Sequence, residues 1–209
     1  MPSKARISGG RSSQDSLIIP NRYETQIDLP PGQYDIRVVL SDREKFGREQ
    51  MPLTVDSYDG KQLAISEIAL SRRIREVSDE SPEAPGRVPG SYVPLVSKGI
   101  EITPTADMRF KKDEPLYAYF EVYEPQYAGQ SATMVQAHLR ILDANTDNVR
   151  IGFEPVNAAP YIKAGSSVIP IGREINLASL SNGSYRLEVQ TTNSTGNSTA
   201  WRTANFTIE

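Results

Sequence analysis

The sequence predicts an all-β protein built from two tandem β-sandwich units, the first of which lacks its opening strands. The segment LPPGQYDIRVVLSD, residues 29–42, recurs without a gap as LSNGSYRLEVQTTN, residues 180–193. Apolar and polar residues alternate with period two in both copies, which is the pattern of half-buried strands. Turn residues separate such segments at the spacing of a sandwich, and no convincing helical period competes with them.

Each copy of the repeat reads as a strand that follows a tight turn. Tyr34, Ile36 and Val38 alternate with polar residues, and the second copy repeats this pattern from Tyr185 onward. A glycine-containing turn precedes each strand. A tyrosine in this position resembles the tyrosine-corner region of immunoglobulin-like and fibronectin type III sandwiches, although a β-meander with a buried tyrosine would give the same letters.

Strands are expected on both sides of each copy. The first copy has candidate strands at 15–20 and 24–29 before it and at 50–55 after it. The C-terminal part has a fuller set, at 99–104, 114–125, 132–143, 148–155, 166–172, 173–180, 184–191 and 201–209. The first unit therefore resembles the closing strands of a larger domain.

These elements predict three parts of the chain. Residues 1–70 are the N-terminal β unit, and residues 95–209 are a C-terminal β-sandwich domain. Residues 71–94, with four prolines and mixed charges, read as a linker or long loop.

The totals exclude several kinds of chemistry and partner. The 209 residues include 23 Lys and Arg against 26 Asp and Glu, a net charge of -3, which gives no excess of positive charge for nucleic acid. The absence of Cys rules out disulfides and cysteine-ligated zinc. No apolar run of about 18 residues is present, so we expect no membrane insertion. The first residues lack the apolar segment of a secretory signal, which fits a cytosolic chain or a piece of a longer one.

The order of motifs between about residues 24 and 125 resembles a known family. LPPGQYDIRVVLSDREKFGREQMPLTV, LAISEIALS, a proline-rich gap and MRFKKDEPLYAYFEVYEP follow one another as in the region after the von Willebrand factor A-type domain of large acidobacterial proteins. The resemblance implies an exported, β-rich protein. The metal-binding signature of the A-type domain, aspartate-x-serine-x-serine, is absent, so no metal site carries over.

Catalytic constellations are not marked in the sequence. The single histidine, His138, alternates with apolar residues and is expected on the outer face of a strand. Paired carboxylates remain open in principle, if the fold brings Glu121 and Glu124 near Asp113 or Glu114. We therefore predict no enzyme and no cofactor.

One segment, DANTDNVRIGFE, spaces oxygen ligands as a helix-loop-helix calcium site does. The ligands would be Asp143, Asn145, Asp147 and Glu154. Asn148 replaces the usual turn glycine and both flanks read as strands, so a polar hairpin turn explains the same residues.

A tyrosine series is the more suggestive binding feature. Tyr117, Tyr119 and Tyr123 share one side of a strand, and Tyr127 follows them. If the other side of the strand faces the core, these rings form an aromatic face that could bind protein, peptide or sugar. A central strand covered on both sides by the protein itself would show the same pattern.

These observations favour a non-enzymatic structural or interaction module of a larger exported or cell-envelope protein, extracellular or periplasmic in location. The incomplete first unit would leave a strand edge unpaired, which favours a protein partner or self-association. The alternative is a carbohydrate- or peptide-binding module that uses the tyrosine face.

Overall fold

The computed structural model describes residues 27–41, 46–77, 94–125, 134–163 and 165–209. Over these residues the protein is all-β, as predicted, and its helical element is a short 3-10 turn, Ala159–Tyr161. No helix in the described ranges is long and apolar enough to cross a bilayer.

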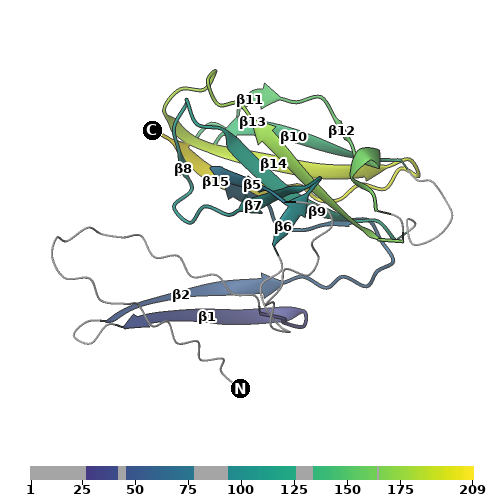
Figure 1. Cartoon of the computed structure of the whole chain (residues 1–209), viewed down its shortest axis with the longest axis horizontal. Coiled ribbons are helices and arrows are strands. Elements are labelled where there is room, and N and C mark those ends of the chain that lie inside the picture. Colours follow the sequence, from purple (N-terminus) through teal and green to yellow (C-terminus); the bar gives the residue numbers. More distant parts are fainter. Residues whose placement is uncertain (1–26, 42–45, 78–93, 126–133, 164) are drawn as a thin grey trace.

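Two sheets form a sandwich (Figure 1). The first has the order β11-β10-β14-β15-β8, with β12 also paired to β10, and only β15 and β8 run parallel. In the second sheet β9 lies between β13 on one side and the short strands β3 and β4 on the other. The strands are β3 (Ala64–Ile65), β4 (Ala69–Ser71), β8 (Arg109–Phe110), β9 (Leu116–Tyr123), β10 (Val135–Asp143), β11 (Val149–Gly152), β12 (Val156–Asn157), β13 (Val168–Ile175), β14 (Gly183–Asn193) and β15 (Arg202–Ile208).

The core lies between these sheets because each strand turns its alternate apolar residues inward. From β9 it receives Leu116, Phe120 and Val122, and from β14 it receives Leu187 and Val189, all fully buried. Burial of each such side chain contributes about 1.5–3 kcal/mol, so this layer stabilises most of the fold.

A third, smaller sheet packs on the outside of the second sheet. It consists of β5 (Arg73–Glu76), β7 (Ile100–Thr103) and β6 (Leu95–Ser97). The Ser97 hydroxyl donates to the Pro170 carbonyl at 2.8 Å and accepts from the Gly172 amide at 2.9 Å. A Cβ atom at Gly172 would lie 3.0 Å from the Ile102 side chain. Glycine therefore permits the close approach of the two sheets.

The first copy of the repeat forms a separate hairpin of β1 (Gly32–Ser41) and β2 (Phe46–Val55), which extends beside the sandwich in Figure 1. The tandem arrangement of two sandwich units is therefore not seen in the described residues, where the first unit is a two-stranded sheet.

The two copies share their local geometry. The Tyr34 hydroxyl donates to the Pro30 carbonyl at 2.7 Å, and the Tyr185 hydroxyl donates to the Ser181 carbonyl at 2.8 Å. The glycine two residues before each tyrosine has φ of 158° or 157°, a conformation that other residues rarely adopt. Local sequence thus produces the same corner in two different surroundings.

The predicted domain boundaries differ from the observed pairing. Residues 64–71 were expected mainly in the N-terminal unit, but β3 and β4 pair with β9 of the sandwich. Residues 73–76, expected in the linker, pair with β7. These segments are too short to show a period of their own, so only their long-range partners define them. The candidate strand at 15–20 and residues 78–93 lie outside the described residues. So does the first half of the candidate strand at 24–29, whose described part, 27–29, is not a strand.

We expect Tyr185→Phe to lower the free energy of unfolding by about 1 kcal/mol, since it removes a partly buried hydrogen bond. The matched change Tyr34→Phe should have almost no effect on sandwich unfolding, because its bond is exposed and outside the core. Urea unfolding followed by the fluorescence of Trp201, the single tryptophan, compares the two. Equal losses would contradict this assignment.

Candidate functional site

The tyrosines of β9 lie on the outer face of the second sheet, as the period-two pattern predicts. Leu116, Ala118, Phe120 and Val122 point to the core and are fully buried. Tyr117, Tyr119, Glu121 and Tyr123 occupy the alternate positions. Tyr127 lies outside the described residues.

This outer face is largely covered by the protein itself. Tyr119 is only 5% exposed. It pairs with Gly172, against which the third sheet packs through Ser97 and Ile102. The open aromatic face expected from sequence is therefore closed at its centre.

Glu121 uses both carboxylate oxygens to hold two of the tyrosines. The hydroxyls of Tyr119 and Tyr123 donate to them at 2.9 and 2.8 Å. The Glu121 amide also donates to the Ser66 hydroxyl at 2.9 Å, while the Ser66 amide donates to the Glu121 carbonyl. This arrangement, the Glu121 clamp, ties the segment after the hairpin to β9.

Tyr58 extends the clamp toward the hairpin. Its ring lies 5.0 Å from the Tyr123 ring, measured between centroids, at a tilt of 39°. Burial raises the pKa of Tyr123 well above its ordinary value, and the hydrogen bond and charge of Glu121 raise it further. Burial also raises the pKa of Tyr117, with Glu174 as the next cause. Tyr117 and Tyr123 are therefore neutral groups, and neither is set up for ionisation.

The carboxylates considered for acid-base chemistry do not converge. Glu114 precedes β9 and Glu124 follows it, so they are separated by a strand about 27 Å long. Glu124 is buried and accepts a 2.9 Å hydrogen bond from the Asn193 side chain. Glu121 lies on the outer face of the sheet. Its carboxylate accepts hydrogen bonds from two tyrosine hydroxyls and does not face a second acid in these contacts.

Three of the candidate calcium residues, Asp143, Asn145 and Asp147, lie in one turn, where both carboxylates already have arginine partners. Asp143 accepts hydrogen bonds from the Asn145 and Thr146 amides and from Arg150, and this last contact lowers the pKa of Asp143. Asp147 pairs with Arg186 at 2.8 Å.

Glu154 lies farther along the sheet than a shared ion would allow. The Phe153 amide donates to the Leu139 carbonyl, about 14 Å along β10 from Asp143, and Glu154 lies beyond Phe153. A hairpin turn accounts for the motif, and in the described ranges no three acidic or histidine side chains gather as a metal site would require.

His138 lies on the outer face of β10, as expected, and its Nε2 atom is 3.1 Å from the Thr192 hydroxyl. The same face carries an ionic ladder that the sequence analysis missed. The Glu188 carboxylate, 5% exposed, pairs with Arg140 at 2.7 Å and Arg186 at 2.8 Å.

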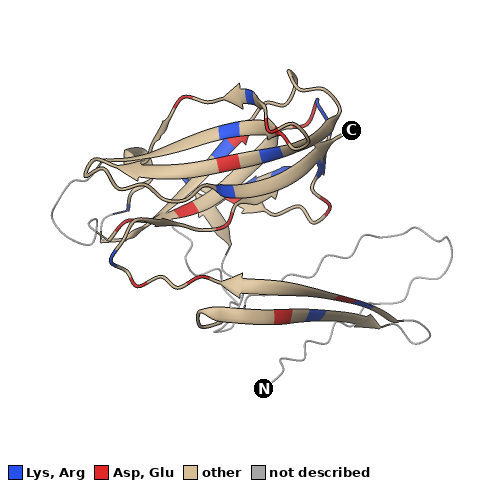
Figure 2. Ribbon diagram, turned by 180° about the vertical axis from the view of Figure 1, so that it is seen from behind, with Lys and Arg blue, Asp and Glu red and all other residues tan. Residues whose placement is uncertain are grey.

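Figure 2 shows both charge signs on neighbouring strands of the sandwich. Arg140 also lies over the Trp201 ring at 4.1 Å. In the sequence, this ladder is visible only as charged residues at the polar positions of 135–143 and 184–192. Which of these residues face one another depends on the register of the two strands.

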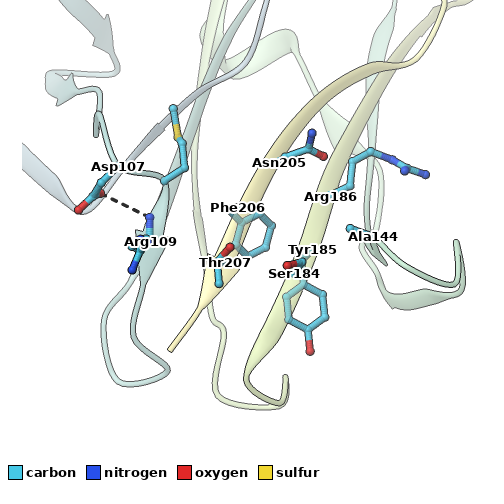
Figure 3. A pocket seen from close by; sticks show the side chains of 10 residues that line it. Asp107, Arg109, Ala144, Ser184, Tyr185, Arg186, Asn205, Phe206 and Thr207 are labelled. Atoms are coloured by element: carbon cyan, nitrogen blue, oxygen red, sulfur yellow. Dashed lines mark hydrogen bonds between the residues drawn. The ribbon is translucent and has the colours of Figure 1, made fainter.

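A surface groove runs between the turn at Asp107–Arg109 and strands β14 and β15 (Figure 3). Its lining is mostly polar, with Arg109 and Arg186 at opposite sides. Both arginines already have acidic partners, Glu209 and Asp147, and Asp107 of the same groove pairs with Arg72. The groove therefore lacks a free charged group that would select a ligand.

The hairpin supplies the remaining unusual surface. Tyr34, Ile36, Val38 and Leu40 share one side of β1 and lie opposite Leu53, Met51, Glu49 and Gly47 of β2. Val38, Leu40 and Met51 are 46%, 67% and 49% exposed. The corresponding positions of the second copy, from Tyr185 to Val189, are at most 5% exposed.

No protein-family model and no curated protein matches the chain. Among solved structures, the soluble domain of PmoD from Methylocystis sp. ATCC 49242 (Rockwell) is similar over 51% of this chain and 81% of that chain. The sequence identity is 13% and the TM-score is 0.32. At this level the similarity has no bearing on function, and the resemblance to acidobacterial proteins stays a prediction.

We expect Glu121→Gln to lower the pKa of Tyr123 while leaving it above the ordinary value of about 10, because burial is the larger cause. In the wild type the raised pKa contributes stability below pH about 10, and this is lost at higher pH as the unfolded chain ionises first. Tyrosinate absorbance during an alkaline titration measures the shift. Tyr123→Phe is the control that removes the late step. An unchanged titration in Glu121→Gln would contradict the clamp.

Proposed function

We propose that the chain is a non-enzymatic interaction module of a larger exported or cell-envelope protein, with an extracellular or periplasmic location. The observation that carries the interaction role is the exposed apolar side of the β1-β2 hairpin. Exposed apolar patches of this kind mark protein contacts. An isolated two-stranded hairpin is also marginally stable, so a further layer would stabilise it.

The immunoglobulin-like or fibronectin type III-like character of both units belongs to the same proposal. Its support is the pair of tyrosine corners, in which each hydroxyl bonds to a carbonyl four residues upstream. The exported location rests on the resemblance to the acidobacterial proteins.

A carbohydrate- or peptide-binding role for the tyrosines of β9 has less support. Tyr119 is buried, and the hydroxyls of Tyr119 and Tyr123 are both bonded to Glu121. A ligand would have to displace the third sheet or use Tyr117 at the rim.

A photo-crosslinking residue placed at Leu40 tests the interaction role in the organism that carries the chain. We expect a covalent adduct with a protein at Leu40, which is 67% exposed on the apolar side. The matched position is Thr54, which is exposed on the opposite side of the hairpin. Adduct formation should be several-fold stronger at Leu40. Equal yields at both positions, or no adduct at either, would count against the proposal.

A further inference from the structure

The apolar side of the hairpin is a continuous surface, which we call the hairpin face. Strand register places Tyr34, Ile36, Val38, Leu40, Met51, Leu53 and Val55 on it. In the described residues, three of the ten large apolar side chains that are strongly exposed lie on the hairpin face: Val38, Leu40 and Met51. Val39 and Phe46 are exposed on the opposite side of the hairpin, and Ile27 precedes it. Exposure is thus concentrated on one element instead of being scattered over the surface.

The second copy of the repeat shows what such a face requires. Tyr185, Leu187 and Val189 occupy the positions of Tyr34, Ile36 and Val38, and all three belong to the main core. There β9 and β13, two strands of eight residues each, supply the opposite layer. An opposing sheet with an apolar side is therefore the natural cover for the hairpin face.

The described part of the sandwich has no free apolar surface of that size. Its second sheet is covered by β14 and β15 on the inside and carries the third sheet on the outside. The other exposed large apolar residues, Tyr58, Ile74, Met134 and Val149, lie on separate segments of the described chain. The 26 residues before Ile27 contain one apolar run, 17–20. Among the surfaces that the structure describes, the one that matches the hairpin face in size and apolar character is the same face on another molecule.

The hairpin is also held in place at its junction with the sandwich. Arg202 of β15 forms ion pairs with Asp56, directly after β2, and with Glu67 at 3.0 Å. The Tyr58 ring packs at a tilt against the Tyr123 ring of β9. These contacts hold the segment that follows the hairpin against the sandwich, while both hairpin strands keep an unpaired outer edge in the described structure.

We propose that the hairpin face docks on the same face of a second copy of this chain about a two-fold axis, an inference that rests on the proposed interaction function. Two-fold symmetry brings identical surfaces together. The product is a two-layer, four-stranded sandwich with its sheets about 10 Å apart. Ile36 and Met51, a cross-strand pair halfway along the hairpin, lie nearest the axis.

The area of the hairpin face determines how tightly two copies should bind. Ten residues at about 3.4 Å each and two strands about 4.8 Å apart give roughly 340 Å² per copy before side-chain relief is counted. This is small beside the roughly 800 Å² per partner of a standard interface, so we expect a reversible dimer with a dissociation constant in the micromolar range. Glu49 is the one charged side chain on this side of the two strands, and the net charge of -3 opposes association little.

Light scattering of the purified chain from about 1 to 100 µM tests this, with a mass that should rise from monomer to dimer. Ile36→Lys with Met51→Lys should raise the dissociation constant at least about 100-fold, because docking would bury unpaired charges. The matched control is Gln33→Lys with Thr54→Lys, a cross-strand pair on the opposite side that adds the same charge. It should dimerise like the wild type.

Cysteine cross-linking keeps the test valid if the lysine variant distorts the hairpin. The chain has no Cys, so a single introduced thiol reports one position. Met51→Cys should form an intermolecular disulfide under mild oxidation, whereas its neighbour Gln50→Cys, on the opposite side, should not.

A monomer at all concentrations, equal loss of dimer in both lysine variants, or equal cross-linking at positions 50 and 51 would overturn self-docking. In that event an adduct at Leu40 with a different protein would still support the interaction function. Absence of that adduct as well would remove both proposals.

Discussion

The structure depends on one constraint: a two-stranded sheet with an apolar side needs a second layer over that side. In the second copy of the repeat this layer is β9 with β13, and their contact with β14 and β15 buries Phe120, Leu187 and Val189 completely. The same sequence pattern in the first copy forms the same strands and the same tyrosine corner, but its apolar side stays partly exposed. The strands and the tyrosine corner therefore form with or without an opposing sheet, whereas burial of the apolar side chains requires that sheet.

The position of β9 at the centre of the second sheet explains why its tyrosines are structural. Its inner side faces the core, and its outer side receives the third sheet and the segment from Tyr58 to Ser66. The Glu121 carboxylate is partly buried on this side, and the two tyrosine hydroxyls donate hydrogen bonds to it. An aromatic series that could have served binding instead joins the hairpin segment to the sandwich.

Ion pairs connect the C-terminal strand β15 to the segment that follows the hairpin. Arg202, the first residue of β15, pairs with Asp56 and Glu67, which lie between the hairpin and β4. Most surface ion pairs contribute little to stability, but here they also fix the direction in which the chain leaves the hairpin. The sandwich thus holds the segment that follows the hairpin, while Val38, Leu40 and Met51 of the hairpin face stay exposed.

The sequence by itself determined the all-β class, the strand alternation and the paired tyrosine corners, because these arise from neighbouring residues through period two, turn glycines and a hydroxyl that reaches four residues back. Tertiary structure decided the rest. It assigned residues 64–71 and 73–76 to sheets, covered Tyr119, turned Glu121 into a clamp and separated Asp143 from Glu154. Each of these outcomes depends on which distant strand pairs with which, and short segments contain too little periodicity to specify their partners.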